Sequence, residues 1–252
     1  MKSLLVLTAT LLSAGCLGLP RAQAADAVNP ANDARCDAVL QKFVQALGGR
    51  EALEKITNSL ANATVTMAGM ELPLELYRAA PAQQATRIEI PGMGVVREVF
   101  DGQRAWSVNP FAGDTEKSGE ELAKTARDAA FHQPLRMKEL FAPLAYLRAQ
   151  KLDGREAEVL EARMAAGAVE RFYFGADNGL LVRRDSEFAA AAGRVKTESL
   201  FEDYRVVDGV RQPHLMRLKI EAADQAPMEL QIKITALRQN VTLPANVFAK
   251  PQ

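Results

Sequence analysis

The fold of this chain is decided by two stretches near its C-terminus, Met216-Arg217-Leu218-Lys219-Ile220-Glu221 and Met228-Glu229-Leu230-Gln231-Ile232-Lys233-Ile234. In both, apolar and polar residues alternate at every step, which is the period of a β-strand with one dry and one wet face. Such strands are typical of an antiparallel sheet that is solvated on one side. We therefore predict that Lys219 and Lys233 face water. The apolar positions are predicted to face inward: Met216, Leu218, Ile220, Leu230, Ile232 and Ile234.

The same alternation recurs in shorter form along most of the chain. Further strands are predicted around residues 64–67, 72–77, 86–90, 95–100, 104–108, 168–174, 180–187 and 195–204. Turn dipeptides separate several of them, such as Asp101-Gly102 and Asn178-Gly179. About ten short strands joined mostly by tight turns predict an α+β fold on a long antiparallel meander, which twists and curls.

The apolar face of such a sheet needs a cover, and few segments can supply one. Helical spacing predicts a first helix from Asp33 to Leu47, ended by Gly48-Gly49, and a short second helix over 51–56. Residues 119–148 form an insert that has the pattern of helical pieces broken by prolines. Helices in the concavity of a curled sheet leave an apolar space incompletely filled. We therefore predict one domain over 25–252, with this insert across its concave face.

The insert 119–148 has two open interpretations. It carries many large hydrophobic residues, among them Phe141 and Leu144, and it is interrupted by Pro134 and Pro143. It is either a core-packing subdomain or a movable lid whose side chains adapt to a ligand in an apolar cavity. Trp106, which shares strand phase with Val108, is likewise either core filler or a side chain that faces this cavity.

The N-terminus has the pattern of a secretory signal peptide. Lys2 precedes an apolar run over 4–19, and Ala22-Gln23-Ala24 gives the small-x-small pattern of a cleavage site before Ala25. The apolar run is shorter than the ~20 residues of a spanning helix. We therefore expect residues 1–24 to be removed, which places the mature protein in the periplasm without a transmembrane span.

The two cysteines receive different predictions. Ser13-Ala14-Gly15-Cys16 resembles a lipobox, so a form anchored by a lipid on Cys16 is the less favoured alternative to soluble export. Cys36 lies on the apolar side of the first predicted helix. We expect it to be a buried small hydrophobe rather than a redox group.

Composition and motifs disfavour several classes of function. The 31 basic and 31 acidic residues cancel, so no global field attracts nucleic acid, and a nucleic-acid partner is not expected. The motifs of zinc proteases, redox dithiols, serine hydrolases and phosphate loops are missing. The two histidines, His132 and His214, lie far apart in the sequence, and Gly92-Met93-Gly94 is predicted to be a hairpin turn rather than a dinucleotide site. We therefore expect no catalytic residue, no metal and no cofactor.

Several short pieces of the sequence resemble a known family. They are Arg78-Ala79-Ala80-Pro81, Arg87-Ile88-Glu89-Ile90 and Asp101-Gly102-Gln103-Arg104-Ala105-Trp106-Ser107-Val108-Asn109-Pro110-Phe111. Their order of proline, hydrophobic strand, Asp-Gly turn, tryptophan strand and Asn-Pro is similar to that of the periplasmic carriers that sort outer-membrane lipoproteins, the LolA/LolB-like proteins. The endings Leu243-Pro244 and Phe248 also resemble those of relatives. One position departs from the family, because the carriers place a functionally important arginine immediately before the proline, where this chain has Ala80.

The resemblance implies a strongly curved, incomplete β-barrel with helices across its mouth and a hydrophobic cavity for acyl chains. On this basis we predict a non-catalytic periplasmic carrier or binding protein for a lipid, an acyl chain or a lipoprotein. The alternative is a regulatory or scaffold module of the cell envelope that binds a protein partner through the same fold. The residues expected to line the cavity and its lid are Met67, Leu76, Ile88, Trp106, Phe141, Leu144, Phe172 and Leu218.

Overall fold

The computed structural model describes residues 30–110, 113–164, 167–190, 193–222 and 226–251. The predicted signal peptide, its cleavage site and Cys16 lie outside these ranges. In chain order the elements are α1 (Pro30–Ala46), α2 (Arg50–Glu54), β1 (Asn58–Met67), β2 (Met70–Ala79), β3 (Gln83–Ile90), β4 (Gly94–Phe100), β5 (Ala105–Val108), β6 (Thr115–Glu116), α3 (Gly119–Ala129), the 3-10 helix η1 (Gln133–Leu135), α4 (Met137–Leu140), β7 (Leu144–Leu152), β8 (Arg155–Arg163), β9 (Val169–Gly175), β10 (Leu181–Ala190), β11 (Gly193–Val207), β12 (Val210–Ala222) and β13 (Met228–Gln239). None of the helices in the described ranges has the length and apolar character needed to span a bilayer.

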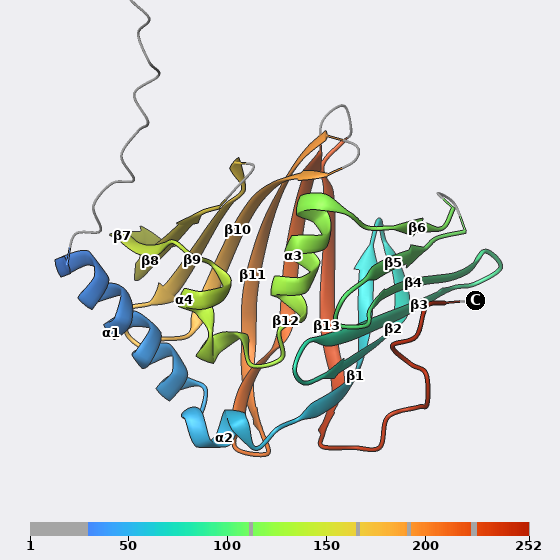
Figure 1. Ribbon diagram of the computed structural model, residues 1–252, viewed down its shortest axis with the longest axis horizontal. Helices are drawn as coiled ribbons and strands as arrows, with labels where there is room; N and C mark the ends of the chain where they lie inside the picture. Colours follow the sequence, from blue (N-terminus) through green and yellow to red (C-terminus); the bar gives the residue numbers. More distant parts are fainter. Residues whose placement is uncertain (1–29, 111–112, 165–166, 191–192, 223–225, 252) are drawn as a thin grey trace, which may run out of the picture.

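One antiparallel sheet of 13 strands makes up most of the fold (Figure 1). Its strand order is β6-β5-β4-β3-β2-β1-β13-β12-β11-β10-β9-β8-β7. Because β1 pairs with β13, the chain runs outward from the middle of the sheet to the edge strand β6. It then returns inward from the opposite edge strand, β7. The predicted α+β class, with an open, curved antiparallel sheet and helices on one face, is confirmed.

The segment between the two edge strands crosses the concave face of the sheet. It contains α3, η1 and α4, which lie in front of the strands together with α1 (Figure 1). This crossing is a consequence of the strand order, because β6 and β7 stand at opposite edges and the chain must connect them. The topology thereby places the central segment over the apolar face.

The strand count is higher than the predicted ten, and β6, β7 and β8 account for the difference. The expectation that the helical insert extends to residue 148 is wrong beyond α4, because Leu144 begins β7. β7 is rich in leucine, alanine and basic residues, and β8 is rich in glutamate, alanine and arginine; all of these residue types favour helices locally. Pairing with neighbouring strands overrides that preference. The turn Asp153-Gly154, with φ values of 47° and 81°, is the hairpin signal that could have identified the pair.

The predicted phase of the last two strands is confirmed by their register. Met216 pairs with Ile232 and Leu218 pairs with Leu230, so these side chains share one face. Ile234 is buried, whereas Met216, Leu218, Ile220, Leu230 and Ile232 are half-buried. Lys219 and Lys233 are exposed. The apolar face is therefore turned inward, but it is only partly covered.

Candidate functional site

The helices cover one half of the concave face completely. We call the resulting cluster the helix-covered core. Its buried members come from α1, α2, α4, β7, β8 and β9 and the chain around them: Cys36, Val39, Phe43, Leu47, Leu53, Ile56, Met137, Phe141, Leu144, Tyr146, Leu160, Ala162, Phe172, Phe174, Leu180 and Val210. The rings of Phe141 and Phe172 pack with their centroids 4.8 Å apart, and both residues are 0% exposed. This half is therefore filled by its own side chains.

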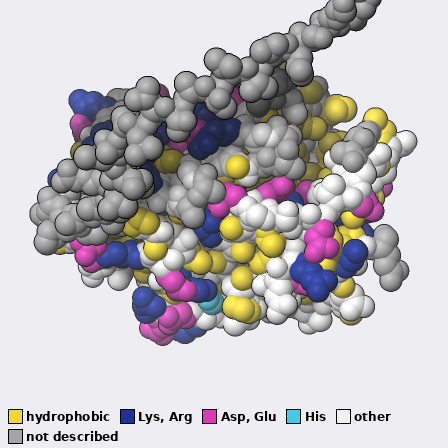
Figure 2. Space-filling view, turned by 45° about the horizontal axis from the view of Figure 1, so that its top comes forward, with side chains coloured by type: hydrophobic (Ala, Val, Ile, Leu, Met, Phe, Trp, Pro, Cys, Tyr) yellow, Lys and Arg dark blue, Asp and Glu magenta, His cyan; other side chains and the backbone are white. Residues whose placement is uncertain are grey.

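The other half carries a second cluster, which we call the apolar floor. It consists of the buried Ala61, Ala63, Val65, Leu74 and Ile234 together with the partly buried Met67, Leu76, Ile88, Met216, Leu230, Ile232 and Leu237. These residues come from five strands that are adjacent in the sheet, in the order β3-β2-β1-β13-β12. In the space-filling view, hydrophobic side chains are visible between charged ones near the centre of the molecule (Figure 2).

A cavity of about 260 Å³ lies where the two clusters meet. Its sheet side includes Ala61, Leu76, Met216, Ile234 and Leu237 of the apolar floor. Its helix side is formed by side chains that belong to or flank α1, α2 and η1: Phe43, Leu47, Leu53, Ile56, Phe131, His132 and Pro134. The volume is slightly below the roughly 300–1,000 Å³ of small-molecule sites, and the predominantly apolar lining is typical of them.

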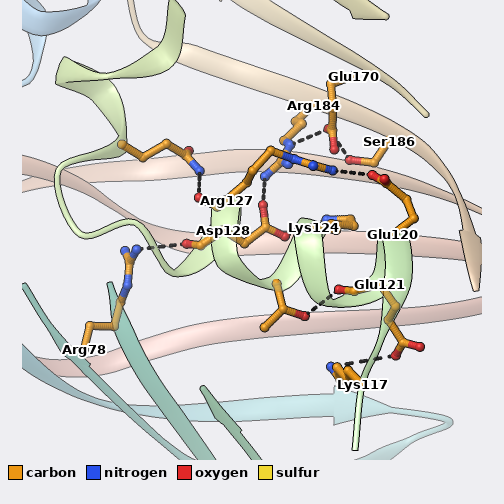
Figure 3. Close-up of polar contacts among 12 residues, drawn as sticks. Arg78, Lys117, Glu120, Glu121, Lys124, Arg127, Asp128, Glu170, Arg184 and Ser186 are labelled. Atoms are coloured by element: carbon orange, nitrogen blue, oxygen red, sulfur yellow. Dashed lines mark hydrogen bonds and ion pairs between the residues drawn. The ribbon is translucent and has the colours of Figure 1, made fainter. Parts of the chain in front are cut away.

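Charged side chains join α3 to the sheet (Figure 3). Arg184 of β10 contacts Asp128 of α3 at 2.8 Å and Glu170 of β9 at 2.8 Å. Burial alone would raise the pKa of Asp128, but Arg184 and Lys124 outweigh burial and hold it well below its usual range. Burial would likewise lower the pKa of Arg184, and the two carboxylates raise it instead. In this network, cations and anions compensate one another.

Arg78 of β2 has a different environment. It donates hydrogen bonds to the carbonyl oxygens of Asp128, at 3.0 Å, and of Ala130, at 3.2 Å, at the end of α3 (Figure 3). Its guanidinium lies 5.7 Å from the ring centroid of Phe131. Within the described ranges no carboxylate forms an ion pair with Arg78, and its buried Nε has no hydrogen-bond partner. Burial lowers the pKa of Arg78, and the charge of Asp128 opposes this effect.

The structure brings together only some of the residues predicted to bind a ligand. Leu76 lines the cavity, and Met67 and Ile88 belong to the apolar floor. Leu218 lies beside Leu230 on the same face. By contrast, the helix-covered core contains Phe141, Leu144 and Phe172, each less than 9% exposed. Of the two interpretations of the insert, packing into the core therefore describes Phe141 and Leu144.

The prediction that Trp106 faces the cavity is wrong. Trp106 pairs with Val99, and it packs with Tyr77, Ala85 and the C-terminal residues Leu243, Val247 and Phe248. Tyr77 is the sequence neighbour of Leu76, and adjacent residues of a strand point to opposite faces of the sheet. Trp106 therefore lies on the convex face, where its indole N–H donates to Glu116 at 3.2 Å. Trp106 and Val108 do lie in the same strand, two residues apart. No local pattern, however, shows which face of β5 lies on the same side of the sheet as Leu76 of β2.

Sequence reasoning missed several residues that line the cavity, in particular Phe43, Leu47, Phe131 and Arg78. Phe43 and Leu47 belong to the first predicted helix and its end, and their spacing of four residues places both on the side of the helix that faces the sheet. Phe131 and Arg78 meet only because the crossing segment returns over β2. No sequence pattern reports that contact.

Comparison with solved structures identifies the architecture. A LolA superfamily protein from Nitrosomonas europaea matches with a TM-score of 0.53 and 14% identity, over 85% of this chain and 97% of the other. A putative outer membrane lipoprotein-sorting protein domain from Vibrio parahaemolyticus matches with a TM-score of 0.52 and 13% identity, over 85% and 97%. The chain has the LolA-like fold. A DUF1329 family protein from Desulfovibrio piger has a similar fold, with a TM-score of 0.54 and 14% identity over 84% and 96% of the two chains.

The resemblance read from the sequence is thus confirmed at the level of the LolA-like fold. No protein-family model matches the sequence, and no curated protein matches it either. Within the described residues, no group of three or more histidine, cysteine, aspartate or glutamate side chains is arranged to hold a metal ion. What this LolA-like chain offers chemically is an apolar cavity with a cation at its wall.

Proposed function

We propose that this protein is a periplasmic, non-catalytic carrier or binding protein for a lipid or for the acyl chains of a lipoprotein. The observation that carries the proposal is the cavity at the junction of the helix-covered core and the apolar floor. The N-terminal signal pattern supports export, and the LolA-like fold supports the choice of ligand class.

The energetics of such a site require no reactive group. Each acyl methylene removed from water contributes ~0.8 kcal/mol. Ten such groups would therefore contribute roughly 8 kcal/mol before the costs of association and ordering are subtracted. Met67, Ile88, Leu218 and Leu230 extend the apolar surface beyond the cavity and are the residues on which the rest of the chain would lie.

The segment 119–136 is the part that we propose to move when a ligand enters. Its helix α3 is held by ion pairs and by two hydrogen bonds from Arg78. Polar contacts of this kind are exchanged for contacts with water at low net cost. The side chains of Met137, Phe141 and Leu144 belong to the helix-covered core, so the moving part ends before Met137.

The proposal is tested with a neutral naphthylamine probe whose fluorescence rises in apolar surroundings, and by mass spectrometry of lipid extracted from the exported protein. Leu76→Glu places a carboxylate in the cavity wall and is expected to weaken probe binding at least tenfold. Leu147→Glu is the matched control, because Leu147 is 38% exposed on β7. It should bind the probe like the parent protein.

Failure of the parent protein to bind any acyl probe, together with extracts that contain no lipid, would reject the carrier. Retention of a protein partner under the same conditions would favour the alternative of an envelope scaffold or regulatory module.

A further inference from the structure

The charged groups around the cavity are all of one sign. Its lining contains two arginines, Arg78 and Arg211, and one histidine, and no aspartate or glutamate. The imidazole of His132 is already used, because its Nε2 lies 2.9 Å from the carbonyl oxygen of Ile56 and donates to it. Within the described residues, neither arginine forms a side-chain ion pair. A cavity with this lining is complementary to an anion rather than to a neutral or cationic group.

Arg78 is the better placed of the two cations. Its hydrogen-bond and ring partners are two carbonyl oxygens and the face of Phe131, which stabilise a cation without forming an ion pair with it. The nearest acid, Asp128, is itself engaged by Arg184 and Lys124. The Nε of Arg78 is buried and without a partner. A buried polar group in this condition costs free energy unless something occupies it.

The apolar floor leads away from this cation. Ile234 and Leu76 line the cavity beside Arg78, and the floor continues through Ile232 to Leu230 along β13. Four residues of strand at ~3.3 Å each give a path of ~13 Å. Val65 and Met67 of β1 pair with Ile232 and Leu230, so the path is apolar on both of its strands.

We propose, on the basis of the function proposed above, that the cavity selects single amphiphiles with an anionic oxygen head group, carboxylate or phosphate, that binds Arg78 while the acyl chain lies on the apolar floor. A guanidinium offers several N–H groups in a planar fork that fits either head group. The ligand would complete the hydrogen bonding of Arg78 and neutralise its charge.

The test compares dodecanoate, dodecyl phosphate and dodecanol as competitors of the neutral naphthylamine probe at pH 8, below their aggregation limits. An anionic ligand is expected to bind at least tenfold more tightly than the alcohol, which is the contribution of one charge-assisted hydrogen bond. The stronger of the two anions identifies the head group. For dodecanoate, the preference should disappear as the pH is lowered until the ligand carboxyl is protonated.

Arg78→Gln should reduce the ratio of anion to alcohol affinity to within about twofold, and Arg78→Lys should keep part of it. Arg87→Gln changes a half-buried arginine on β3 that pairs with Glu89; it is the control and should keep the parent ratio. A merely structural role of Arg78 would lower all three affinities together and leave their ratio unchanged. The ratio is therefore the readout.

Equal binding of dodecanol and of both anions by the parent protein would overturn the head-group proposal while the carrier proposal stands. Absence of binding by all three would overturn both. If Arg78→Gln fails to fold, the ratio of anion to alcohol affinity is compared between the parent protein and Arg78→Lys. An unchanged ratio in Arg78→Lys would then overturn the assignment of the head group to Arg78.

Discussion

The two halves of the concave face are built from one sheet with one alternating pattern, yet they end in different states. On β8 and β9, Leu160 and Phe172 are 0% exposed, because α1 and α4 seal them. On β12 and β13, Leu218 and Leu230 have the same phase and are only half-buried. The apolar pattern of a strand thus fixes which side faces inward, whereas a covering element determines whether that side is dry. The open half is where an added apolar molecule would bury the most surface.

The largest expected effect comes from a charge in the sealed half. Phe141→Glu removes a ring that is 0% exposed and places a carboxylate in a closed space, where Arg184, 5.4 Å from the ring centroid, is already paired with Asp128 and Glu170. The loss of the ring alone costs ~3–5 kcal/mol, so we expect the domain to unfold. Leu218→Glu in the open half is the control and should remain folded by circular dichroism. A folded Phe141→Glu protein would contradict the conclusion that Phe141 packs in a sealed core, and would favour the interpretation that it belongs to a movable lid.

A matched pair of leucines sharpens the same contrast. Leu160→Ala should destabilise the protein by ~2–5 kcal/mol in urea unfolding, because it leaves a closed cavity. Leu218→Ala should cost only about 1–2 kcal/mol, since its side chain already borders water. Addition of a bound amphiphile should stabilise the parent protein more than Leu218→Ala. Equal losses for the two leucines would remove the distinction between the halves.

The rate at which a cysteine is labelled reports how well each half of the concave face is covered. Burial raises the pKa of Cys36 to about 11, with Lys138 opposing that rise, and Cys36 is 0% exposed on the inner side of α1. Protein prepared from Ala25 onward contains no other cysteine. Labelling of Cys36 at pH 8 should be roughly a hundredfold or more slower than labelling of Leu218→Cys in a Cys36→Ala background, because only local opening exposes it. Similar rates would show that α1 opens as readily as the uncovered floor.

The smallest expected effect concerns the ion pairs between α3 and the sheet. The pKa of Asp128 is lowered in the folded state, so its pairing with Arg184 stabilises fully above the unfolded-state pKa near 3.8 and is lost as the pH falls toward the lower folded value. Because the carboxylate is 31% exposed, the contribution is under about 1 kcal/mol. Asp128→Asn should flatten the stability profile below pH 4. An unchanged profile would assign the acid sensitivity to other groups.

Local pattern was sufficient for a large part of the fold because alternation and helical spacing are properties of consecutive residues. The phase of Met216 to Ile220, the burial of Cys36 and the first helix followed from it. It failed at β7 and β8, where helix-favouring residues are held in strands by their neighbours in the sheet. For the candidate site, strand alternation placed Leu76, Met67 and Ile88 on the apolar face, where the structure has them. It placed Trp106 on the wrong face.

The sequence by itself determined that this chain forms a curled antiparallel sheet with one apolar face and too few helices to cover it. The tertiary structure alone decided where the cover stops, because the pairing of β1 with β13 sends the connection from β6 to β7 across the sheet. That crossing brings Phe131 and the end of α3 onto Arg78, residues about fifty positions apart in the chain. Strand phase is local, but the meeting of a cation with an apolar cavity depends on contacts between distant segments, which only the folded chain specifies.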